Sequence, residues 1–128
     1  MNYDIFKNEI GKLEKYFKKN DKYYKKKTGE NISDYYGISI SLLTIKRLYD
    51  IDINNIKQDD INIFKRFFKY YSIMWRVTYN KDKRLYLLKN DVHSIAENRV
   101  NIILKNINIF RKIYNYYKDK NNISIFNI

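Results

Sequence analysis

Apolar residues that recur every three or four positions are the feature that most constrains this chain, because such a stripe forms one face of an α-helix. The longest stripe lies towards the end of the sequence and comprises Val92, Ala96, Val100, Ile103, Ile107, Phe110, Tyr114 and Tyr117. A second stripe comprises Ile61, Phe64, Phe68, Tyr71 and Trp75. A third, near the N-terminus, comprises Phe6, Ile10, Leu13, Phe17 and Tyr24. The sequence therefore predicts a mainly α fold of four to five helices.

The near absence of helix-breaking residues supports this fold class. The 128 residues include no proline and only three glycines, whereas sandwiches and barrels usually carry more of both. There is no cysteine, which excludes a disulfide scaffold, iron–sulfur clusters and thiol catalysis. Because 45% of the residues are hydrophobic, the chain can bury one core, and we expect residues 1–128 to form a single basic helical domain.

The stripes and the turn signals between them predict the order of the elements. Gly37 suits a tight turn before a second helix, and Asp59 and Asp60 are placed to cap a third. The predicted elements are a basic N-terminal helix over 1–27, a helix after Gly37, a basic helix over 60–75, and a long C-terminal helix over 91–118.

The period of the pattern changes after the third helix. Trp75, Val77 and Tyr79 alternate with polar residues, and Asn80 begins a polar stretch typical of a turn. This pattern predicts a small β-hairpin over 76–88, so that 60–88 forms a basic helix plus a hairpin. The alternative is that the helix continues to Tyr79 and another begins near Lys83.

Charge is distributed unevenly along the chain. The formal net charge is +12. It divides into +5 over residues 1–27, −3 over 28–60, +7 over 61–89 and +3 over 90–128. A gene rich in A and T also enriches lysine, but an acidic middle between basic blocks indicates surfaces with different roles. A basic surface of this kind favours nucleic acid as the partner.

The most basic block supplies the candidate nucleic-acid-binding residues. The predicted order, three helices followed by a hairpin and a long helix, resembles that of a winged-helix protein with a C-terminal dimerisation helix. The resemblance implies a non-enzymatic DNA-binding regulator that prefers duplex DNA and forms a homodimer through the helix around Val92 to Tyr117. The expected contacts to DNA are Lys65, Arg66, Lys69, Arg76, Lys81, Lys83 and Arg84.

Two other placements of a nucleic-acid contact remain open. The segment 31–48 resembles a helix-turn-helix, with Gly37 and Ile38 at the turn, although Lys46 occupies a position where that motif usually has an apolar residue. Lysines next to tyrosines, as in 22–27, could instead hold single strands by stacking and phosphate contacts.

The sequence offers little that resembles a catalytic centre. His93 is the one histidine, so a histidine pair cannot hold a metal ion. Asp50, Asp52, Asp59 and Asp60 lie where capping explains them, and neither a glycine-rich phosphate loop nor a G-x-S-x-G turn is present. We therefore expect a protein that is not an enzyme and needs no cofactor or metal.

A different class of function also fits the composition. A small viral or mobile-element accessory protein could bind and inhibit a host protein, using its basic face against an acidic protein surface. Acidic residues interrupt the N-terminal region where a signal peptide would be apolar, and the longest uncharged run, 35–45, is too short to span a membrane. These features predict an intracellular protein.

Overall fold

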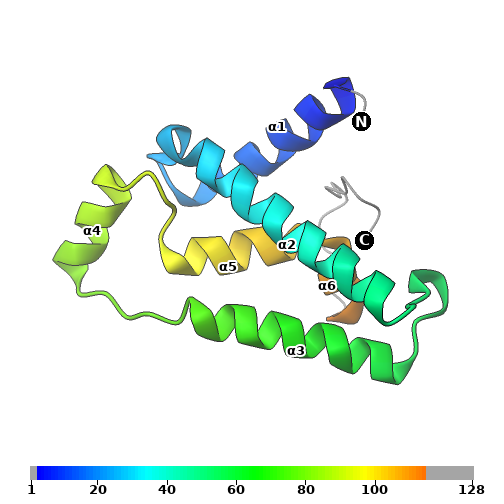
Figure 1. The fold of residues 1–128 in the computed structure, drawn as a ribbon. Helices are drawn as coiled ribbons and strands as arrows, with labels where there is room; N and C mark the ends of the chain where they lie inside the picture. Colours follow the sequence, from blue (N-terminus) through cyan, green and yellow to red (C-terminus); the bar gives the residue numbers. More distant parts are fainter. Residues whose placement is uncertain (1–2, 115–128) are drawn as a thin grey trace.

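The computed structural model describes residues 3–114, and within that range the chain is helical without strands (Figure 1). The mainly α fold class is therefore confirmed. The elements are α1 (Tyr3–Asn20), the short 3-10 helix η1 (Tyr24–Lys27), α2 (Thr28–Leu48), the 3-10 helix η2 (Ile53–Asn55), α3 (Gln58–Met74), α4 (Lys81–Asn90), α5 (Ala96–Lys105) and α6 (Asn108–Ile113).

Helix α5 lies at the centre of the arrangement, because α1, α2, α3 and α6 all pack against it. In Figure 1 it runs between α2 and α3, whereas α4 stands apart at the end of an extended connection. The core consists of residues on these central helices, including Phe17, Leu42, Phe64, Phe68, Ile103 and Ile109. Burial of each large apolar side chain contributes about 1.5–3 kcal/mol.

The apolar spacing that predicted the third helix also places the buried residues of α3. Phe64 and Phe68 lie four residues apart on α3, and both are buried. The Phe68 ring meets the Phe110 ring of α6 edge-on, with 5.0 Å between the centroids. At the start of α3, the Asp60 carboxylate accepts a hydrogen bond from the Lys57 backbone N–H at 2.9 Å. The capping role expected of Asp60 is thus observed.

The predicted turn at Gly37 is wrong, because α2 passes through this residue without a break. The helix-turn-helix alternative over 31–48 is wrong for the same reason. Gly37 is exposed and has no positive φ, so the helix accepts it at the cost of its low propensity. The chain turns instead after α2, where Asp50 has a φ of 49° and the Ile51 N–H donates to the Lys46 carbonyl at 2.9 Å.

The predicted hairpin over 76–88 is also wrong, and with it the winged-helix order. Helix α3 ends at Met74, an extended connection follows, and α4 begins at Lys81. The Asn80 side chain accepts a hydrogen bond from the Lys83 backbone N–H at 2.8 Å and so caps α4. The polar residues taken for a hairpin turn are therefore the start of a helix.

The long helix over 91–118 is two shorter helices in the structure. Residues 91–95 are not helical, α5 ends at Lys105, and α6 begins at Asn108. Between them Ile107 adopts an extended backbone and is buried. The break turns α6 so that it packs against α3. Residues 115–118 lie outside the described range.

Candidate functional site

A cleft of about 440 Å³ lies between the C-terminal end of α1 and α5. Helix α1 contributes Tyr16, Lys19 and Asn20 to its wall. The residues contributed by α5 and the turn after it are Glu97, Asn98, Asn101, Ile102, Lys105 and Asn106. Asparagine is therefore the most frequent residue of the wall. We call this feature the α1–α5 cleft.

The geometry of α5 gathers its polar residues on the side that faces the cleft. Asn98, Asn101 and Lys105 are three and four residues apart, so they lie along one side of the helix. Asn98 is only 8% exposed. Its Nδ2 group is buried without a hydrogen-bond partner, which is unfavourable for an amide donor. Asn106, by contrast, donates to the Ile102 carbonyl at 2.7 Å.

The charges around the cleft come mainly from lysine. The Lys19 ammonium lies 5.6 Å from the centre of the Tyr16 ring, in a cation–π contact. Glu97 is the acidic residue of the wall, and it forms an ion pair with Arg84 of α4. Lys19 and Lys105 thus outnumber the single carboxylate, which already has a partner.

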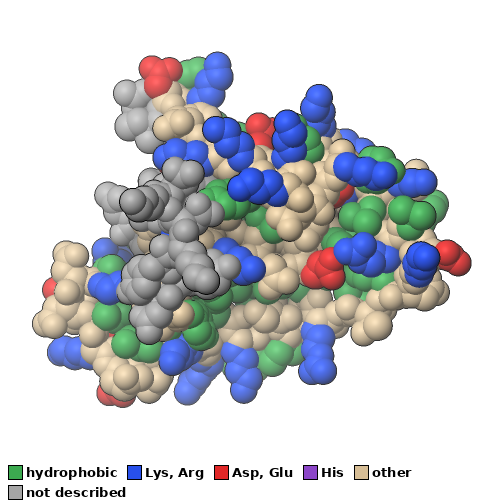
Figure 2. Space-filling model, turned by 180° about the vertical axis from the view of Figure 1, so that it is seen from behind, with side chains coloured by type: hydrophobic (Ala, Val, Ile, Leu, Met, Phe, Trp, Pro, Cys, Tyr) green, Lys and Arg blue, Asp and Glu red, His purple; other side chains and the backbone are tan. Residues whose placement is uncertain are grey.

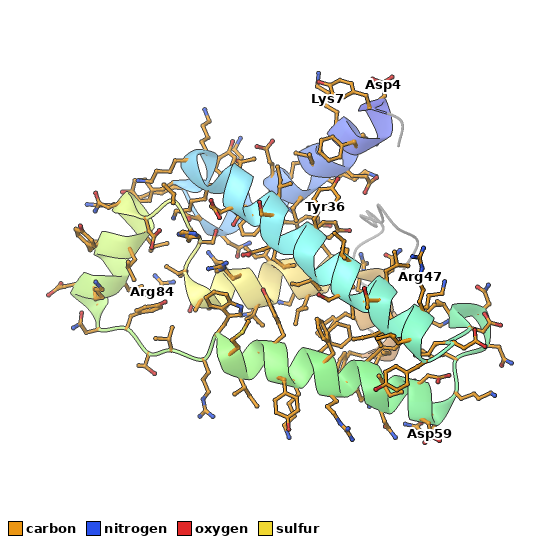
Figure 3. The ribbon with its side chains drawn as sticks, in the orientation of Figure 1. Asp4, Lys7, Tyr36, Arg47, Asp59 and Arg84 are labelled. Atoms are coloured by element: carbon orange, nitrogen blue, oxygen red, sulfur yellow. The ribbon has the colours of Figure 1, made fainter. Side chains whose placement is uncertain are left out.

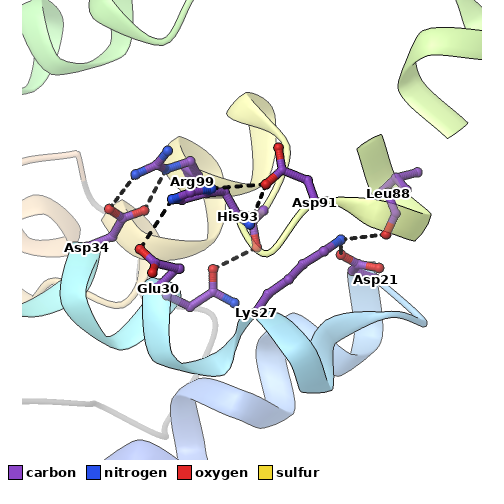
Figure 4. Close-up of polar contacts among 10 residues, drawn as sticks. Asp21, Lys27, Glu30, Asp34, Leu88, Asp91, His93 and Arg99 are labelled. Atoms are coloured by element: carbon purple, nitrogen blue, oxygen red, sulfur yellow. Dashed lines mark hydrogen bonds and ion pairs between the residues drawn. The ribbon is translucent and has the colours of Figure 1, made fainter. Parts of the chain in front are cut away.

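A polar network ties α2, α3 and α5 together, and Figure 4 shows the part between Asp34 of α2 and Arg99 of α5. Arg99 donates two hydrogen bonds to the Asp34 carboxylate, both at 2.7 Å, and its guanidinium lies 3.8 Å from the centre of the Trp75 ring. The Tyr71 hydroxyl donates to the Arg99 carbonyl at 3.2 Å.

This network changes the acidity of its members. Burial raises the pKa of Tyr71 to about 12, and the nearby Asp34 charge adds to this effect while Arg99 opposes it. Burial disfavours the charged form of Arg99, but the hydrogen bonds and charge of Asp34 outweigh burial and raise the Arg99 pKa. Both groups therefore keep their usual charge at neutral pH, as expected for a structural network.

His93 is the one residue of the chain that could supply an imidazole to a metal ion. Its Nδ1 lies 3.0 Å from Asp91 Oδ1, and its Nε2 lies 3.3 Å from Glu30 Oε2 (Figure 4). The His93 backbone N–H donates to the Asp91 carboxylate, and this hydrogen bond lowers the Asp91 pKa. The two carboxylates approach opposite nitrogens of the ring, so they do not converge on one point. Within residues 3–114, no three of the residues His, Cys, Asp and Glu form a metal-binding group.

The structure disperses the residues predicted to bind DNA. Lys65, Arg66 and Lys69 are exposed on α3, Arg76 lies in the connection, and Lys81, Lys83 and Arg84 lie on α4. Figure 3 shows Arg84 at the opposite end of the molecule from Asp59, where α3 begins. Basic side chains are spread over several elements of the face drawn in Figure 2. One member of the predicted set, Arg84, is joined to the cleft through its ion pair with Glu97.

The asparagines of the cleft were missed by sequence reasoning. Asn98 lies between Glu97 and Arg99, and Asn101 follows Val100. Neither position is distinctive in the sequence, because the burial of Asn98 is a property of the folded chain. Asparagine is also frequent throughout the chain, which made any one asparagine look ordinary.

Comparison with protein families places the chain among the peptidases. It belongs to peptidase family M13, since the model described as Peptidase family M13 matches residues 6–124. No curated protein and no solved structure matches it significantly.

The family match corrects the functional predictions. The interpretation as a non-enzymatic, DNA-binding regulator of winged-helix type is wrong, and so is the alternative of an accessory protein that inhibits a host protein. The predicted partners, duplex DNA or an acidic protein surface, are therefore wrong as well. The helix assigned to a homodimer contact instead places Ile102, Ile103 and Leu104 in the core of one chain.

Two further points bear on where the protein acts. Among the described helices, none combines the length and the apolar character needed to cross a membrane. The intracellular location stays a prediction.

Proposed function

We propose that this chain functions in peptide hydrolysis as part of a family M13 peptidase, and that its described residues bind the peptide substrate. The single observation that carries the proposal is the match to Peptidase family M13, which extends over residues 6–124 and thus over nearly all of the described chain. The residues that line the α1–α5 cleft, from Tyr16 to Asn106, all lie within the matched range.

The chemistry of the cleft supports a peptide ligand. A peptide group has one N–H donor and one carbonyl acceptor, and an asparagine side chain offers both a carbonyl and an NH₂ group. Asn20, Asn98 and Asn101 line the cleft. A cleft of about 440 Å³ falls within the usual range of ligand sites, which is roughly 300–1,000 Å³.

The residues described here do not fit the metal ion that the family implies. A metallopeptidase uses such an ion to activate the attacking water. His93 would be the obvious ligand, but its two ring nitrogens already face Asp91 and Glu30 on opposite sides. We therefore assign no hydrolytic step to residues 3–114 and assign to them the binding of the peptide.

The proposal is tested by measuring peptide binding to the full chain. A set of fluorescein-labelled synthetic decapeptides is titrated with the protein, and fluorescence anisotropy is followed. We expect saturable binding of at least part of the set. The control is polyethylene glycol of similar mass with the same dye, which lacks peptide groups. If the protein binds none of the peptides at millimolar protein, or binds the control equally well, the proposal fails.

A further inference from the structure

We propose that the C-terminal half of α3 and the connection after it attach the protein to the surface of an anionic lipid bilayer. We call this surface the α3 face, and it comprises Arg66, Lys69, Tyr70, Ile73, Met74 and Val77. The inference goes beyond the proposed function and does not depend on it, because the α3 face shares no residue with the α1–α5 cleft. Two observations carry it: a group of exposed apolar side chains, and basic residues on the same side of the helix.

Large apolar side chains project into solvent from the end of α3. Tyr70, Ile73 and Met74 are three and four residues apart, so they share one side of the helix, and Val77 follows in the connection. Their exposed fractions lie between 48% and 67%. A single exposed apolar residue is ordinary, whereas neighbouring ones on one face indicate an interaction surface.

The charged residues of the α3 face are both basic. Arg66 lies one helical turn before Tyr70, and Lys69 lies one turn before Ile73, so they share the side of the apolar group. Residues 61–81 include five bases and no acid. Neither Arg66 nor Lys69 belongs to any ion pair found within residues 3–114. In Figure 2, the lower edge of the molecule, where α3 runs, shows Lys and Arg side chains with hydrophobic surface between them.

An anionic bilayer offers both kinds of contact at the depth that each requires. Negative phosphate groups at its surface attract lysine and arginine, and hydrocarbon begins beneath them. The long side chains of Arg66 and Lys69 extend to the headgroups while Ile73 and Met74 enter the apolar layer. Tyr70 suits the interface, where amphipathic rings collect. A surface that is only acidic would satisfy the bases and leave the apolar side chains without a partner.

The end of α2 provides a comparison within the same chain. Leu48 is the last residue of α2 and is 75% exposed, just as Met74 is the exposed last residue of α3. The charges near Leu48 are mixed, because Arg47 precedes it and Asp50 and Asp52 follow it. Both helices therefore end in an exposed apolar side chain, and the positive charge distinguishes the α3 face.

The test follows the two helix ends with a fluorescent label. The chain contains no cysteine, so Met74→Cys and Leu48→Cys each provide one site for a dye whose emission shifts to the blue in apolar surroundings. Each labelled protein is titrated with vesicles of phosphatidylcholine containing one quarter phosphatidylglycerol, and with vesicles of phosphatidylcholine alone. We expect a saturable blue shift of the Met74 label with the anionic vesicles, a much weaker response to the neutral ones, and a Leu48 label that stays unchanged.

A pair of charge variants assigns the attraction to the α3 face. On the labelled Met74→Cys background, Arg66→Gln/Lys69→Gln should weaken binding to anionic vesicles about tenfold or more, since each base near such a surface contributes roughly fivefold. The matched control is Lys15→Gln/Lys18→Gln on α1, which removes the same charge from exposed positions that are also three residues apart. The control should change binding less than about twofold, because charges distant from the bilayer are screened by salt.

Each outcome decides the question. A Met74 label that does not respond to anionic vesicles overturns the inference. Equal weakening by the two charge variants overturns it too, because general attraction of a basic chain would then explain the binding. A blue shift of the Met74 label that appears without vesicles as the protein concentration rises assigns the α3 face to a second copy and also overturns it. Peptide binding by the same proteins is measured separately, so the proposed function stands or fails on its own.

Discussion

Lys27 joins two parts of the chain that are far apart in sequence. Its side chain is completely buried, pairs with the equally buried Asp21, and donates to the Leu88 carbonyl of α4 at 2.8 Å (Figure 4). A buried charge that loses its partner is far more costly than a pair that is replaced as a whole. Lys27 therefore fixes the end of α4 to the turn after α1.

Lys27→Met should lower the free energy of unfolding by about 3–5 kcal/mol, because it leaves the Asp21 carboxylate buried and unpaired. The double variant Lys27→Met/Asp21→Leu should recover a large part of this loss. Urea unfolding followed by circular dichroism measures both. A single variant that loses less than about 1 kcal/mol, or a double variant less stable than the single one, would show that the pair is not buried as described.

Tyr71 makes stability depend on pH at the alkaline end. Its folded-state pKa is raised from 10.0 to about 12, so the neutral hydroxyl stabilises the fold fully below pH 10, and this contribution is lost as the pH rises towards 12. Tyr71→Phe removes the titrating group and the hydrogen bond to the Arg99 carbonyl, at a cost of about 1 kcal/mol at neutral pH.

The stability difference between wild type and Tyr71→Phe should therefore shrink between pH 10 and pH 12. Urea unfolding at a series of pH values gives this difference directly, and titration of other tyrosines and lysines cancels between the two proteins. A difference that is constant across this range would contradict the buried position of the hydroxyl.

At the scale of elements, the sequence predicted those helices whose stripe is both long and buried. The spacing of Phe64 and Phe68 located α3, and Leu13 and Phe17 located α1, because the same residues form the core. Helix ends were harder to predict. Gly37 has a strong turn preference, yet Tyr35, Ile38 and Leu42 around it are buried and keep α2 continuous. Tertiary packing here overrides a local preference.

The continuity of α2 gives a direct prediction. A Cβ atom at Gly37 would meet no other atom within 4 Å, and alanine is favoured over glycine in a helix interior by about 0.8–1 kcal/mol. Gly37→Ala should therefore raise the free energy of unfolding by roughly this amount. Gly29→Ala, in the first turn of α2 and equally unobstructed, should give a smaller gain. If urea unfolding shows that Gly37→Ala is less stable than the wild type, this result would contradict a continuous α2 and support the predicted turn at Gly37.

The break between α5 and α6 and the start of α4 could not be inferred from periodicity. The stripe from Val92 to Tyr114 passes through Ile107, whose side chain is buried although its backbone is extended. One continuous helix and two helices separated at Ile107 have the same apolar spacing. The packing of α6 against α3 decides between them. Likewise, Asn80 serves equally well in a hairpin turn and as a helix cap.

At the scale of the whole molecule, the central position of α5 explains why its apolar face is not available to a second copy. Ile103 is completely buried, and Ile102 and Leu104 on either side are buried as well. The homodimer expected from the sequence assumed that this surface exceeded what one domain covers. The surrounding helices α1, α2, α3 and α6 cover it within a single chain.

Ile103→Asp should therefore unfold the protein rather than separate a folded dimer, because it places a charge in the core. Circular dichroism should show loss of most helical signal, and Ile103→Val should remain folded with a loss of about 0.5–1.5 kcal/mol. A folded Ile103→Asp protein of half the wild-type mass in solution would contradict this account and support the predicted dimer contact.

The candidate site was less predictable than the fold, for a physical reason. Charge patterning pointed to α3 and α4 because exposed basic residues dominate the sequence there, whereas the cleft forms where Lys19 of α1 and Asn98 of α5 come together. Burial and convergence of residues 79 positions apart are properties of the folded chain. The family match supplied what neither pattern could, the link to peptide substrates.

The most direct test of a peptide site in the α1–α5 cleft is the side-chain amide resonance of Asn101, an exposed residue of the cleft wall, in a proton–nitrogen correlation spectrum. The resonance is assigned by its loss in Asn101→Leu. Titration of the wild-type chain with a decapeptide that it binds should move this resonance more than that of Asn31, which lies outside the cleft. An Asn101 resonance that stays in place while the peptide saturates the protein would contradict the account.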